Sequence, residues 1–427
     1  MSISSSDTDR SHLGSIAIVA ALFFIFGFVT WLNGPLIGFA QLAFDLNEFN
    51  AFLVPMAFYL SYFFLALPSS AILKLTGMKK GMALGLWVMA VGAAAFGEFT
   101  TQRWYPGALA GLFTLGAGLA ILQTAVNPYI SILGSIDSAA RRIAVMGICN
   151  KFAGILAPIV LGALVLRDMG DLAAQVATAD PATREILLDR FAAGIHAPYL
   201  AMAGVLALLG VGVVFSPLPE IDPATANTAS DTTADGGRRR GLRQFPHVWL
   251  GALCIFTYVG VEVLAGDAIG AYGTALGLPL DQTKFFTSFT LAAMLLGYLA
   301  GLALIPRYVS QARYLGVSAL LGIGLSIAAF LTGGYVSVGF IAALGFANAM
   351  MWPAIFPLAI KGLGRNTERG AALLIMGIAG GAVVPQTFAW LKQSYDFQAV
   401  FLLLVLPCYL YILYFALRGH RAGQPGQ

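Results

Sequence analysis

The sequence predicts an all-α integral membrane protein whose twelve transmembrane helices form two six-helix halves. Three observations support this fold class: the apolar composition, the number of long apolar segments, and the uneven distribution of lysine and arginine among the loops. Of the 427 residues, 59% are apolar and 10% are charged, whereas soluble domains contain about 25% charged residues. Such a chain has too little polar surface to be soluble, which excludes a nucleic-acid-binding protein and a large globular enzyme.

The number of transmembrane helices follows from the apolar segments, because a helix that crosses the bilayer takes about 20 mainly apolar residues. The first segment is too long for the apolar core of a cleavable signal peptide. The three cysteines fall within apolar segments, so we expect no disulfide and no metal site from them. Twelve segments are long enough, and they lie near residues 16–42, 50–74, 81–99, 106–134, 142–166, 195–216, 247–273, 284–305, 313–332, 336–360, 370–391 and 396–418.

Lysine and arginine determine the predicted orientation, because basic loops stay in the cytoplasm. One set of helix ends carries 17 of the 24 basic residues, and the opposite set carries six. The remaining basic residue, Lys151, falls inside a helix. We therefore expect both termini to be cytoplasmic, in a bacterial-type inner membrane.

Two connections are long, at residues 167–194 and 217–246, and the second separates the two halves that we assign to residues 1–216 and 247–427. Segment 217–246 contains three prolines, a stretch of Thr, Ala and Asp, and the triplet Arg238-Arg239-Arg240. This composition is typical of a flexible linker, and the orientation predicts that it is cytoplasmic. The arginines either anchor the topology or bind anionic lipid head groups.

The two halves resemble each other at a fixed offset of 227 residues. The segment Gly154-Ile-Leu-Ala-Pro158 corresponds to Gly381-Ala-Val-Val-Pro385, and each is preceded at the same distance by an arginine. Two parallel six-helix halves related by an axis along the membrane normal describe the major facilitator architecture, whose substrate site lies between the halves. The repeat therefore predicts this architecture and a central binding site.

Three charged residues lie deep in the predicted helices, where a charge needs a compensating role. Lys151 stands about 14 Å from the basic end of the fifth helix, near the middle of the membrane. Glu262 lies in the seventh helix, at the place equivalent to Asn33-Gly34-Pro35 in the first. Asp267 follows five residues later, and Gly266 allows the helix to unwind so that both carboxylates approach one site. The alternative for Asp267 is a place at the outer water interface.

The predicted helices also contain neutral polar and aromatic residues that suit a sugar. Amide side chains offer both donors and acceptors, and vicinal hydroxyl groups match this chemistry better than a permanent charge does. Aromatic rings can stack on the C–H face of a sugar, although aromatic residues near helix ends are usually interfacial. Single amides often join helices, but the collection points to a ligand site made of Asn33, Gln123, Asn127, Asn150, Asn348 and Gln386, with Trp31, Tyr59, Trp352 and Trp390 as the aromatic candidates.

Several motifs carry a resemblance to a known family. They are Phe23-Phe-Ile-Phe-Gly-Phe-Val-Thr-Trp-Leu-Asn33 in the first helix, Phe58-Tyr-Leu-Ser-Tyr-Phe63 in the second, Gln123-Thr-Ala-Val-Asn-Pro-Tyr-Ile-Ser-Ile-Leu-Gly134 in the fourth, and Trp352-Pro-Ala-Ile-Phe-Pro-Leu-Ala-Ile-Lys-Gly-Leu-Gly364 in the tenth. With these motifs the sequence resembles the fucose/galactose/glucose branch of the major facilitator superfamily over essentially all twelve helices. The resemblance implies the major facilitator fold and a hexose substrate.

The sequence departs from this branch at two positions. Gly34 and Gln123 stand where the fucose symporters have an aspartate and a glutamate, which serve proton coupling and sugar binding there. The pattern from Tyr258 to Asp267 and the segment Asn150-Lys-Phe-Ala-Gly154 look more like the glucose/galactose subgroup, which includes sodium-linked members. The resemblance therefore implies a hexose more strongly than it implies one coupling ion.

We expect a secondary active transporter that takes up a glucose-, galactose- or mannose-type hexose by alternating access, in symport with Na⁺ or H⁺. The six amides and Trp352 are expected to bind the sugar. Glu262, Asp267 and Lys151 are expected to carry the cation-linked step, with a candidate Na⁺ site near the two carboxylates. We expect a monomer whose partners are the sugar and the lipid bilayer, with no cofactor besides the coupling ion and no nucleic acid.

Three alternatives to this function stay open. An uncoupled facilitative sugar transporter, or a permease for fucose or an amino sugar, requires the same fold. A transporter-like membrane sugar sensor belongs to a different class, and neither long connection is large enough for an effector domain. We expect no enzymatic activity, because the histidines lie in tails, loops or helix ends and no catalytic motif occurs in a suitable context.

Overall fold

The computed structural model describes residues 5–132, 139–167, 169–219, 241–305, 307–363 and 366–423. Within these residues every regular element is a helix. Twelve helical segments are long and apolar enough to cross a membrane, and they coincide with the twelve predicted segments apart from differences at their ends. The predicted all-α membrane fold is therefore confirmed.

Among its described residues the first half has ten helices, because the first transmembrane segment is broken and short helices occupy the far end of the bundle. The helices are α1 (Ser5–Trp31), α2 (Asn33–Ala43), α3 (Glu48–Ala51), α4 (Leu53–Thr76), α5 (Met78–Thr101), α6 (Tyr105–Ile132), α7 (Ala139–Leu164), α8 (Met169–Thr178), α9 (Pro181–Ala193) and α10 (His196–Phe215).

The second half is interrupted more often, in its seventh, tenth and eleventh transmembrane segments. Its helices are η2 (Leu242–Gln244), α12 (Pro246–Gly266), α13 (Ile269–Ala275), α14 (Leu280–Thr283), α15 (Phe286–Leu304), α16 (Gln311–Phe330), α17 (Gly334–Asn348), α18 (Met351–Ile360), α19 (Thr367–Met376), η4 (Gly377–Ala379), α20 (Gly380–Leu391), α21 (Phe397–Leu417) and η5 (Gly419–Arg421).

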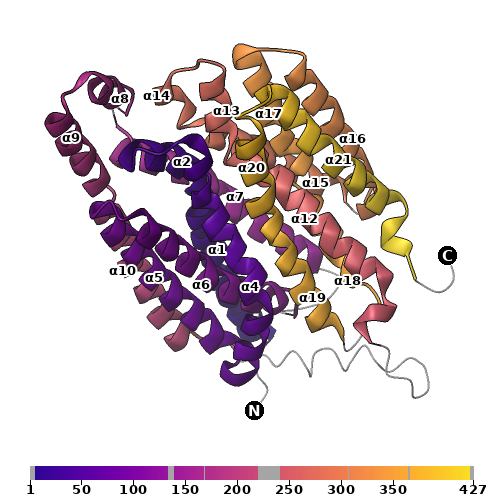
Figure 1. Cartoon of the computed structure of the whole chain (residues 1–427). Coiled ribbons are helices and arrows are strands. Elements are labelled where there is room, and N and C mark those ends of the chain that lie inside the picture. The colour runs from indigo at the N-terminus through magenta and orange to yellow at the C-terminus, as the bar shows by residue number, and fades with distance from the viewer. Residues whose placement is uncertain are drawn as a thin grey trace.

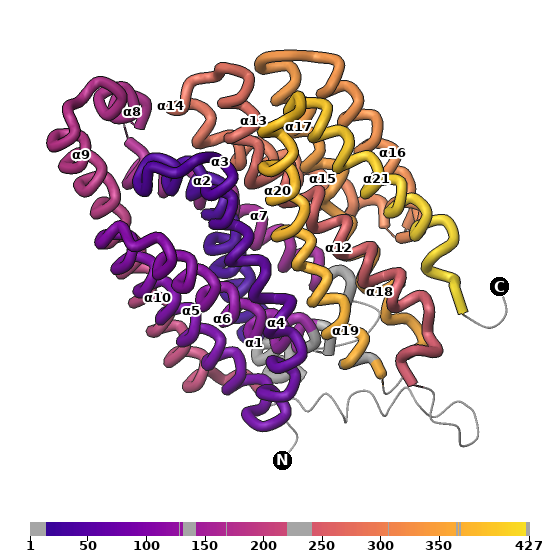
Figure 2. The backbone as a smooth tube through the Cα atoms, viewed as in Figure 1, coloured from indigo at the N-terminus to yellow at the C-terminus, as the bar shows by residue number. Residues whose placement is uncertain are grey.

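The two halves stand side by side, with most helices of the first half on the left of Figure 1 and those of the second half on the right. They meet where α7 packs against both α1 and α15, and where α4 packs against α19 and α20. The tube in Figure 2 shows that the chain begins and ends at the same end of the bundle. The interface between the halves is the place where the sequence analysis expects the substrate site.

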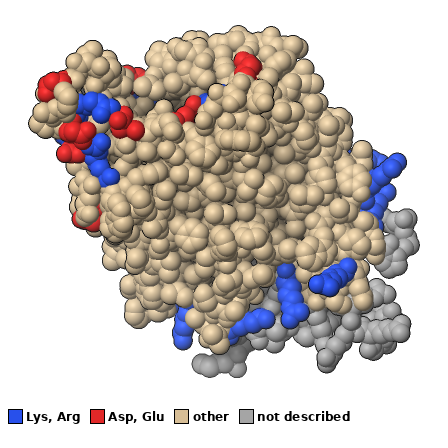
Figure 3. Space-filling model, viewed as in Figure 1, with Lys and Arg blue, Asp and Glu red and all other residues tan. Residues whose placement is uncertain are grey.

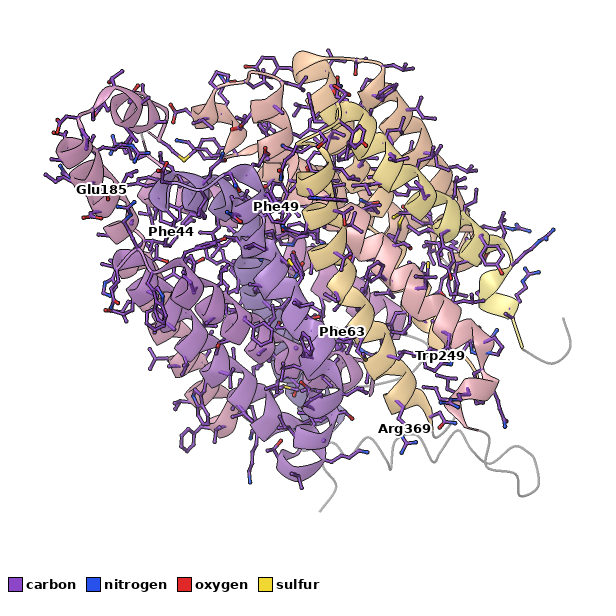
Figure 4. The ribbon with its side chains drawn as sticks, viewed as in Figure 1. Phe44, Phe49, Phe63, Glu185, Trp249 and Arg369 are labelled. Atoms are coloured by element: carbon purple, nitrogen blue, oxygen red, sulfur yellow. The ribbon has the colours of Figure 1, made fainter. Side chains whose placement is uncertain are left out.

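Charge is distributed unevenly along the bundle. Figure 3 shows lysine and arginine side chains gathered at the end that holds both termini, and Figure 4 places Arg369 and Trp249 there. We call this the basic end. At the opposite end, where Figure 4 labels Glu185 on α9, acidic and basic side chains are mixed. The uneven distribution of lysine and arginine along the sequence therefore corresponds to a difference in charge between the two ends of the bundle.

The connection at residues 167–194 is more ordered than the sequence analysis expects, because it forms α8 and α9. Asp180 caps α9 by accepting hydrogen bonds from the backbone nitrogens of Ala182 and Thr183 at 3.1 and 3.2 Å, and Pro181 occupies the first turn. An aspartate followed by proline is a typical helix start. Of the predicted linker 217–246, residues 220–240 lie outside the described part of the chain, and with them the three arginines.

Helices α5 and α6 pack closely because glycines face the neighbouring backbone. A Cβ added at Gly118 on α6 would lie 2.5 Å from the Met89 nitrogen and 2.6 Å from the Gly85 oxygen. A Cβ added at Gly111 would lie 2.5 Å from the Phe96 nitrogen. Small residues let membrane helices approach each other in this way, so the α5–α6 contact depends on the absence of side chains at these positions.

We expect the substitution Gly118→Ala to lower the melting temperature of the purified protein in detergent. Overpacking costs about 1–3 kcal/mol, which exceeds the gain of about 1 kcal/mol in helix propensity. The matched control is Gly212→Ala on α10, where an added Cβ meets no atom within 4 Å, and its melting temperature should stay the same or rise slightly. Equal melting temperatures for the two variants would contradict the close contact.

Candidate functional site

A cavity with a volume of about 120 Å³ lies between the two halves. Its walls come from α1, α4, α6 and α7 of the first half and from α12, α15, α18 and η4 of the second. The wall continues toward the basic end through Ile143 and Gly147, near the start of α7. Its polar and aromatic side chains are Phe23, Phe26, Thr30, Trp31, Tyr59, Tyr62, Gln123, Asn127, Asn150, Lys151, Tyr258, Glu262, Tyr298 and Trp352.

An ion pair between the halves forms part of the cavity wall. The Nζ of Lys151 on α7 lies 2.8 Å from the Oε1 of Glu262 on α12, and the side chains are only 8% and 10% exposed. The sequence analysis groups Lys151 with both Glu262 and Asp267 without choosing a partner for it, and the structure pairs it with Glu262. Because each charge neutralises the other, the pair adds no net charge to the cavity.

Trp31 supports this ion pair from the end of α1. The Lys151 Nζ lies 4.4 Å from the centre of the indole ring, within the range of a cation–π interaction. A Cβ at Gly154 would lie 2.5 Å from the Trp31 Cδ1, and one at Gly266 would lie 2.5 Å from its Cζ3. The ring is therefore held between a glycine of α7 and a glycine of α12, one from each half.

Helix breaks place two tryptophans in the cavity wall. The first transmembrane segment breaks at Leu32, between α1 and α2, because Pro35 cannot donate a backbone hydrogen bond to the carbonyl four residues earlier. The Asn33 Nδ2 donates to the Thr30 oxygen at 2.9 Å and so satisfies one carbonyl at the break. The tenth segment breaks in the same way between α17 and α18, next to Trp352 and Pro353.

Three of the predicted amides line the cavity from the first half. Gln123 on α6 donates from Nε2 to the Tyr62 hydroxyl at 3.0 Å. Asn150 on α7 donates from Nδ2 to the Phe23 oxygen at 3.4 Å. Asn127, one turn after Gln123, faces the same cavity. Gln123 and Asn150 each donate one hydrogen bond here, and an amide offers further donors and acceptors that a hydroxylated ligand can use.

The other three predicted amides are not among the residues that line the cavity. Asn33 is 1% exposed and bonds within its own helix break. Asn348 accepts a hydrogen bond from the Tyr409 hydroxyl at 2.8 Å. Gln386 donates to the Phe49 oxygen at 3.1 Å and thereby connects the halves at the opposite end, where Figure 4 labels Phe49. Hydropathy does not distinguish these inward-facing amides from those of the cavity.

Asp267 and Glu262 have different partners although five residues separate them. Helix α12 ends at Gly266, as the sequence predicts, and Asp267 follows in a turn before α13. The Tyr59 hydroxyl donates to the Asp267 Oδ2 at 3.2 Å. The Oδ1 of Asp267 is buried and has no hydrogen-bond partner. Asp267 is 1% exposed, so it does not lie at an outer water interface in this arrangement.

Contacts between the halves close the site at the opposite end. Lys392, after α20, forms an ion pair with Glu48 on α3, and Lys284 donates to the Leu166 oxygen at 2.7 Å. Burial lowers the pKa of Lys392, and the Glu48 carboxylate opposes this shift. A second cavity of about 150 Å³ lies at this end and is lined by α2, α13, Glu48, Lys284 and Thr287.

The sequence analysis missed the tyrosines of the cavity. Tyr62, Tyr258 and Tyr298 line it together with the predicted Tyr59. The sequence could have indicated two of them by their spacing from predicted residues. Tyr62 follows Tyr59 by three residues and Tyr258 precedes Glu262 by four, so each pair lies on one face of its helix. Of the predicted aromatic residues, Trp31, Tyr59 and Trp352 line the cavity, whereas Trp390 is exposed on the surface.

Known proteins are similar to this chain over most of its length. The glucose/galactose transporter of Brucella abortus is 30% identical over 421 residues, which cover 98% of this chain and 97% of that protein. The L-fucose-proton symporter of Escherichia coli K12 is 26% identical, covering 90% and 88% of the two chains. The solved structure of the transporter FucP in the outward conformation matches with a TM-score of 0.74 and 25% identity, over 95% of this chain and 99% of that one.

The family itself follows from a match over most of the sequence. The model of the Major Facilitator Superfamily matches residues 19–385, which include most helices of both halves and every residue of the cavity wall. Twelve membrane-spanning helices and the cavity between two six-helix halves agree with that match. The chain is therefore an integral membrane protein that belongs to the Major Facilitator Superfamily.

Proposed function

We propose that this protein is a secondary transporter that takes up a neutral hexose by alternating access, coupled to Na⁺ or H⁺. The observation that carries this proposal is the composition of the cavity. Three amides and several aromatic rings surround it, and its two charged residues, Lys151 and Glu262, neutralise each other at 2.8 Å. A cavity with many hydrogen-bonding groups and a neutralised pair of charges suits a polyhydroxylated, uncharged ligand.

We assign the sugar contacts to Gln123, Asn127, Asn150 and Trp352. The amides bind vicinal hydroxyl groups, because each offers a donor and an acceptor. The Trp352 ring stacks with Phe356 at a centroid distance of 5.7 Å and an angle of 24°, which gives a flat apolar platform for the C–H face of a sugar ring. Asn33, Asn348 and Gln386 keep other partners here and reach the sugar only if the halves rearrange.

The names of the relatives support a hexose. A glucose/galactose transporter at 30% identity covers almost the entire chain, and the L-fucose-proton symporter covers 90% of it. Both named substrate classes are neutral monosaccharides. The chemistry of the cavity and the relatives therefore favour a glucose-type hexose, with fucose or an amino sugar as the alternative substrate, and they favour a transporter over an enzyme.

In this proposal the halves at 1–216 and 247–427 rock about the cavity, and segment 217–246 connects them. The basic end is cytoplasmic, because basic loops stay on that side, so both termini lie in the cytoplasm of a bacterial-type inner membrane. The cavity wall extends toward the basic end, and the contacts of Lys392 and Lys284 close the other end. The described arrangement is thus closed to the outside, and one chain is sufficient for transport.

Cation coupling is assigned to Lys151, Glu262 and Asp267. The Lys151–Glu262 pair joins α7 to α12, so it must open when the halves separate. An opened pair leaves each charge without a partner in a low-dielectric site, and a cation on a carboxylate compensates for the loss of the ammonium group. A Na⁺ or H⁺ that neutralises a carboxylate therefore makes the rearrangement possible.

A panel of sugars in proteoliposomes tests the transport function. We expect glucose or galactose to exchange across the membrane without a gradient, and to accumulate when a Na⁺ or pH gradient is applied separately. The readout is labelled sugar inside the vesicles, and protein-free vesicles are the control. Exchange without accumulation under either gradient would instead favour an uncoupled facilitative transporter. Absence of exchange for every neutral hexose would reject the function.

The amide assignment is tested by the variants Gln123→Ala and Gln386→Ala. We expect Gln123→Ala to raise the KM for sugar exchange by about 2- to 13-fold, because a lost hydrogen bond is worth about 0.5–1.5 kcal/mol. Gln386→Ala removes the same side chain outside the cavity and should change KM by less than about twofold. An equal rise in KM in both variants would contradict the assignment of Gln123, rather than Gln386, to the sugar site.

The ion pair is tested through stability and uptake together. Lys151→Gln leaves the Glu262 charge buried and unpaired, so we expect a loss of about 3–5 kcal/mol and a clearly lower melting temperature. The double variant Lys151→Gln/Glu262→Gln should recover most of this loss, because no unpaired charge remains. Glu262→Gln alone should lose cation-driven accumulation but retain sugar exchange.

The control for this prediction is an ion pair at the surface. Arg184 lies 2.7 Å from Asp45, and their side chains are 33% and 56% exposed. Exposed pairs contribute about 0–1 kcal/mol, so Arg184→Gln should leave the melting temperature nearly unchanged. Unchanged accumulation in Glu262→Gln would contradict the role of Glu262, and equal melting temperatures for Lys151→Gln and the double variant would contradict the cost of the unpaired charge.

A further inference from the structure

Asp267 is a buried carboxylate that receives hydrogen bonds from the other half of the molecule. It is 1% exposed and directly follows helix α12 of the second half. The Tyr59 hydroxyl on α4 donates to its Oδ2 at 3.2 Å, and the Gly34 backbone on α2 also hydrogen-bonds the carboxylate. Both donors belong to the first half. These contacts therefore last only while the halves stay together at this place.

The charged form of Asp267 depends on these donors. Asp267 caps the carboxyl end of α12, where the helix dipole disfavours a negative charge. A buried carboxylate without hydrogen bonds is costly, and hydrogen bonds donated to the charged form offset this cost. When the halves separate at this place, the carboxylate loses both donors. A proton on the carboxylate then compensates for the loss, because the neutral acid needs less stabilisation.

The ionisable groups that act on Asp267 come from three helices. They are Tyr59 on α4, Glu262 on α12 and Lys151 on α7. Lys151 and Glu262 form an ion pair at 2.8 Å, so their opposite charges largely cancel at Asp267. Helices α2 and α15 contribute Gly34 and Thr287 here, which do not titrate. Of the three ionisable groups, Tyr59 is the one that hydrogen-bonds to Asp267.

The packing beside Asp267 favours a proton over a metal ion. A Cβ built at Gly34 would lie 2.5 Å from the Thr287 Oγ1 and 3.2 Å from the Asp267 Cα, so α2 and α15 approach closely there. The Thr287 hydroxyl donates to the Gly266 oxygen at 2.8 Å. A metal ion that binds oxygen needs several ligands around it, about six to eight for Ca²⁺. A proton adds no volume and fits this packing.

We propose that Asp267 binds the coupling proton and that Tyr59 is the positioning residue that connects this proton to the sugar. The proposal rests on the sugar transport and cation coupling assigned above, and it deepens them by naming the ion. Tyr59 lines the central cavity, whereas Asp267 is not among the residues that line it. A Cβ at Gly381 on α20 would lie 3.1 Å from the Tyr59 Cγ. The ring is thus held between the carboxylate and the sugar site.

The direction of the Tyr59–Asp267 hydrogen bond reports the state of the carboxylate to the cavity. A tyrosine hydroxyl has one hydrogen to donate. When Asp267 is charged, this hydrogen goes to the carboxylate, and only the lone pairs of the Tyr59 oxygen are available to a sugar. When Asp267 carries a proton, the acid donates to the Tyr59 oxygen, and the phenol hydrogen is free to bind a sugar oxygen. The protonated protein therefore binds sugar more tightly, and bound sugar retains the proton by the same factor.

The position of Asp267 gives the proton a direction. Gly34 and Thr287 line the second cavity, at the end opposite the basic end, and Tyr59 lines the central one, so Asp267 lies between the two. Opening of the outer end removes the donors of the first half and exposes Asp267 to external protons. Closure returns the donors, which favours the charged form and releases the proton on the cytoplasmic side together with the sugar.

Sugar-driven movement of protons in proteoliposomes tests the proposal. In buffer without Na⁺, glucose or galactose that flows into vesicles containing the unaltered full-length protein should acidify the lumen, as read by a trapped pH-sensitive dye. Asp267→Asn should exchange labelled sugar but lose the acidification, because its amide does not take up the proton. Tyr59→Phe keeps the ring and removes the hydroxyl, so it should also continue exchange without acidification. Tyr59→Phe keeps the proposal testable if Asp267→Asn does not fold.

The pH profile of KM separates a positioning role of Tyr59 from a structural one. In the unaltered protein we expect the KM for sugar exchange to fall by about 2- to 13-fold as the pH is lowered and Asp267 takes up its proton, because one hydrogen bond to the sugar is gained. In Asp267→Asn and in Tyr59→Phe this fall should be absent. A merely structural defect would change KM equally at every pH.

The matched control is Tyr272→Phe on α13. Tyr272 is 1% exposed, and its hydroxyl lies 2.8 Å from the Ser337 Oγ, in a contact within the second half. Acidification and the KM profile of this variant should match the unaltered protein. Acidification by Asp267→Asn, a retained KM profile in Tyr59→Phe, or sugar exchange without acidification in the unaltered protein overturns the proposal. Absence of exchange by the unaltered protein in the same vesicles would instead reject the transport function.

Discussion

The ion pair between Lys151 and Glu262 is the interaction on which the arrangement of the halves depends. Each charge comes from a different half, and neither would be stable at this depth without the other. The pair therefore links α7 to α12, and Trp31 lies beside it. It also determines the polarity of the cavity, because neutralised charges leave the amides and aromatic rings as the groups that select a ligand.

Interruptions of helices then determine where polar groups can reach the cavity. Pro35 and Pro353 end hydrogen bonding along the first and tenth segments, and the seventh segment ends at Gly266. Backbone that leaves a helix inside the membrane is tolerated only where protein surrounds it or where it faces a wet cavity. Trp31 and Trp352 of the cavity wall and the buried Asp267 lie next to these breaks, so backbone geometry and side-chain chemistry point to the same part of the molecule.

The sequence was sufficient for the fold and for part of the site. Apolar length predicted the twelve helices, and the need to neutralise a deep charge predicted a partner for Lys151. The sequence could not distinguish Asn150, in the cavity wall, from Asn348, which bonds to Tyr409. A helix that is apolar on all sides has no polar face, so the sequence does not show which side of the helix faces the cavity.

The position of Trp31 makes the protein its own optical reporter. The chain has six tryptophans; Trp87, Trp104, Trp249 and Trp390 are exposed, whereas the ring of Trp31 is 2% exposed. Its indole lies 4.4 Å from an ammonium group and between glycines of opposite halves. Because indole emission responds to nearby charge and to water, separation of the halves changes the light that this ring emits, and the conformational cycle becomes visible without an attached dye.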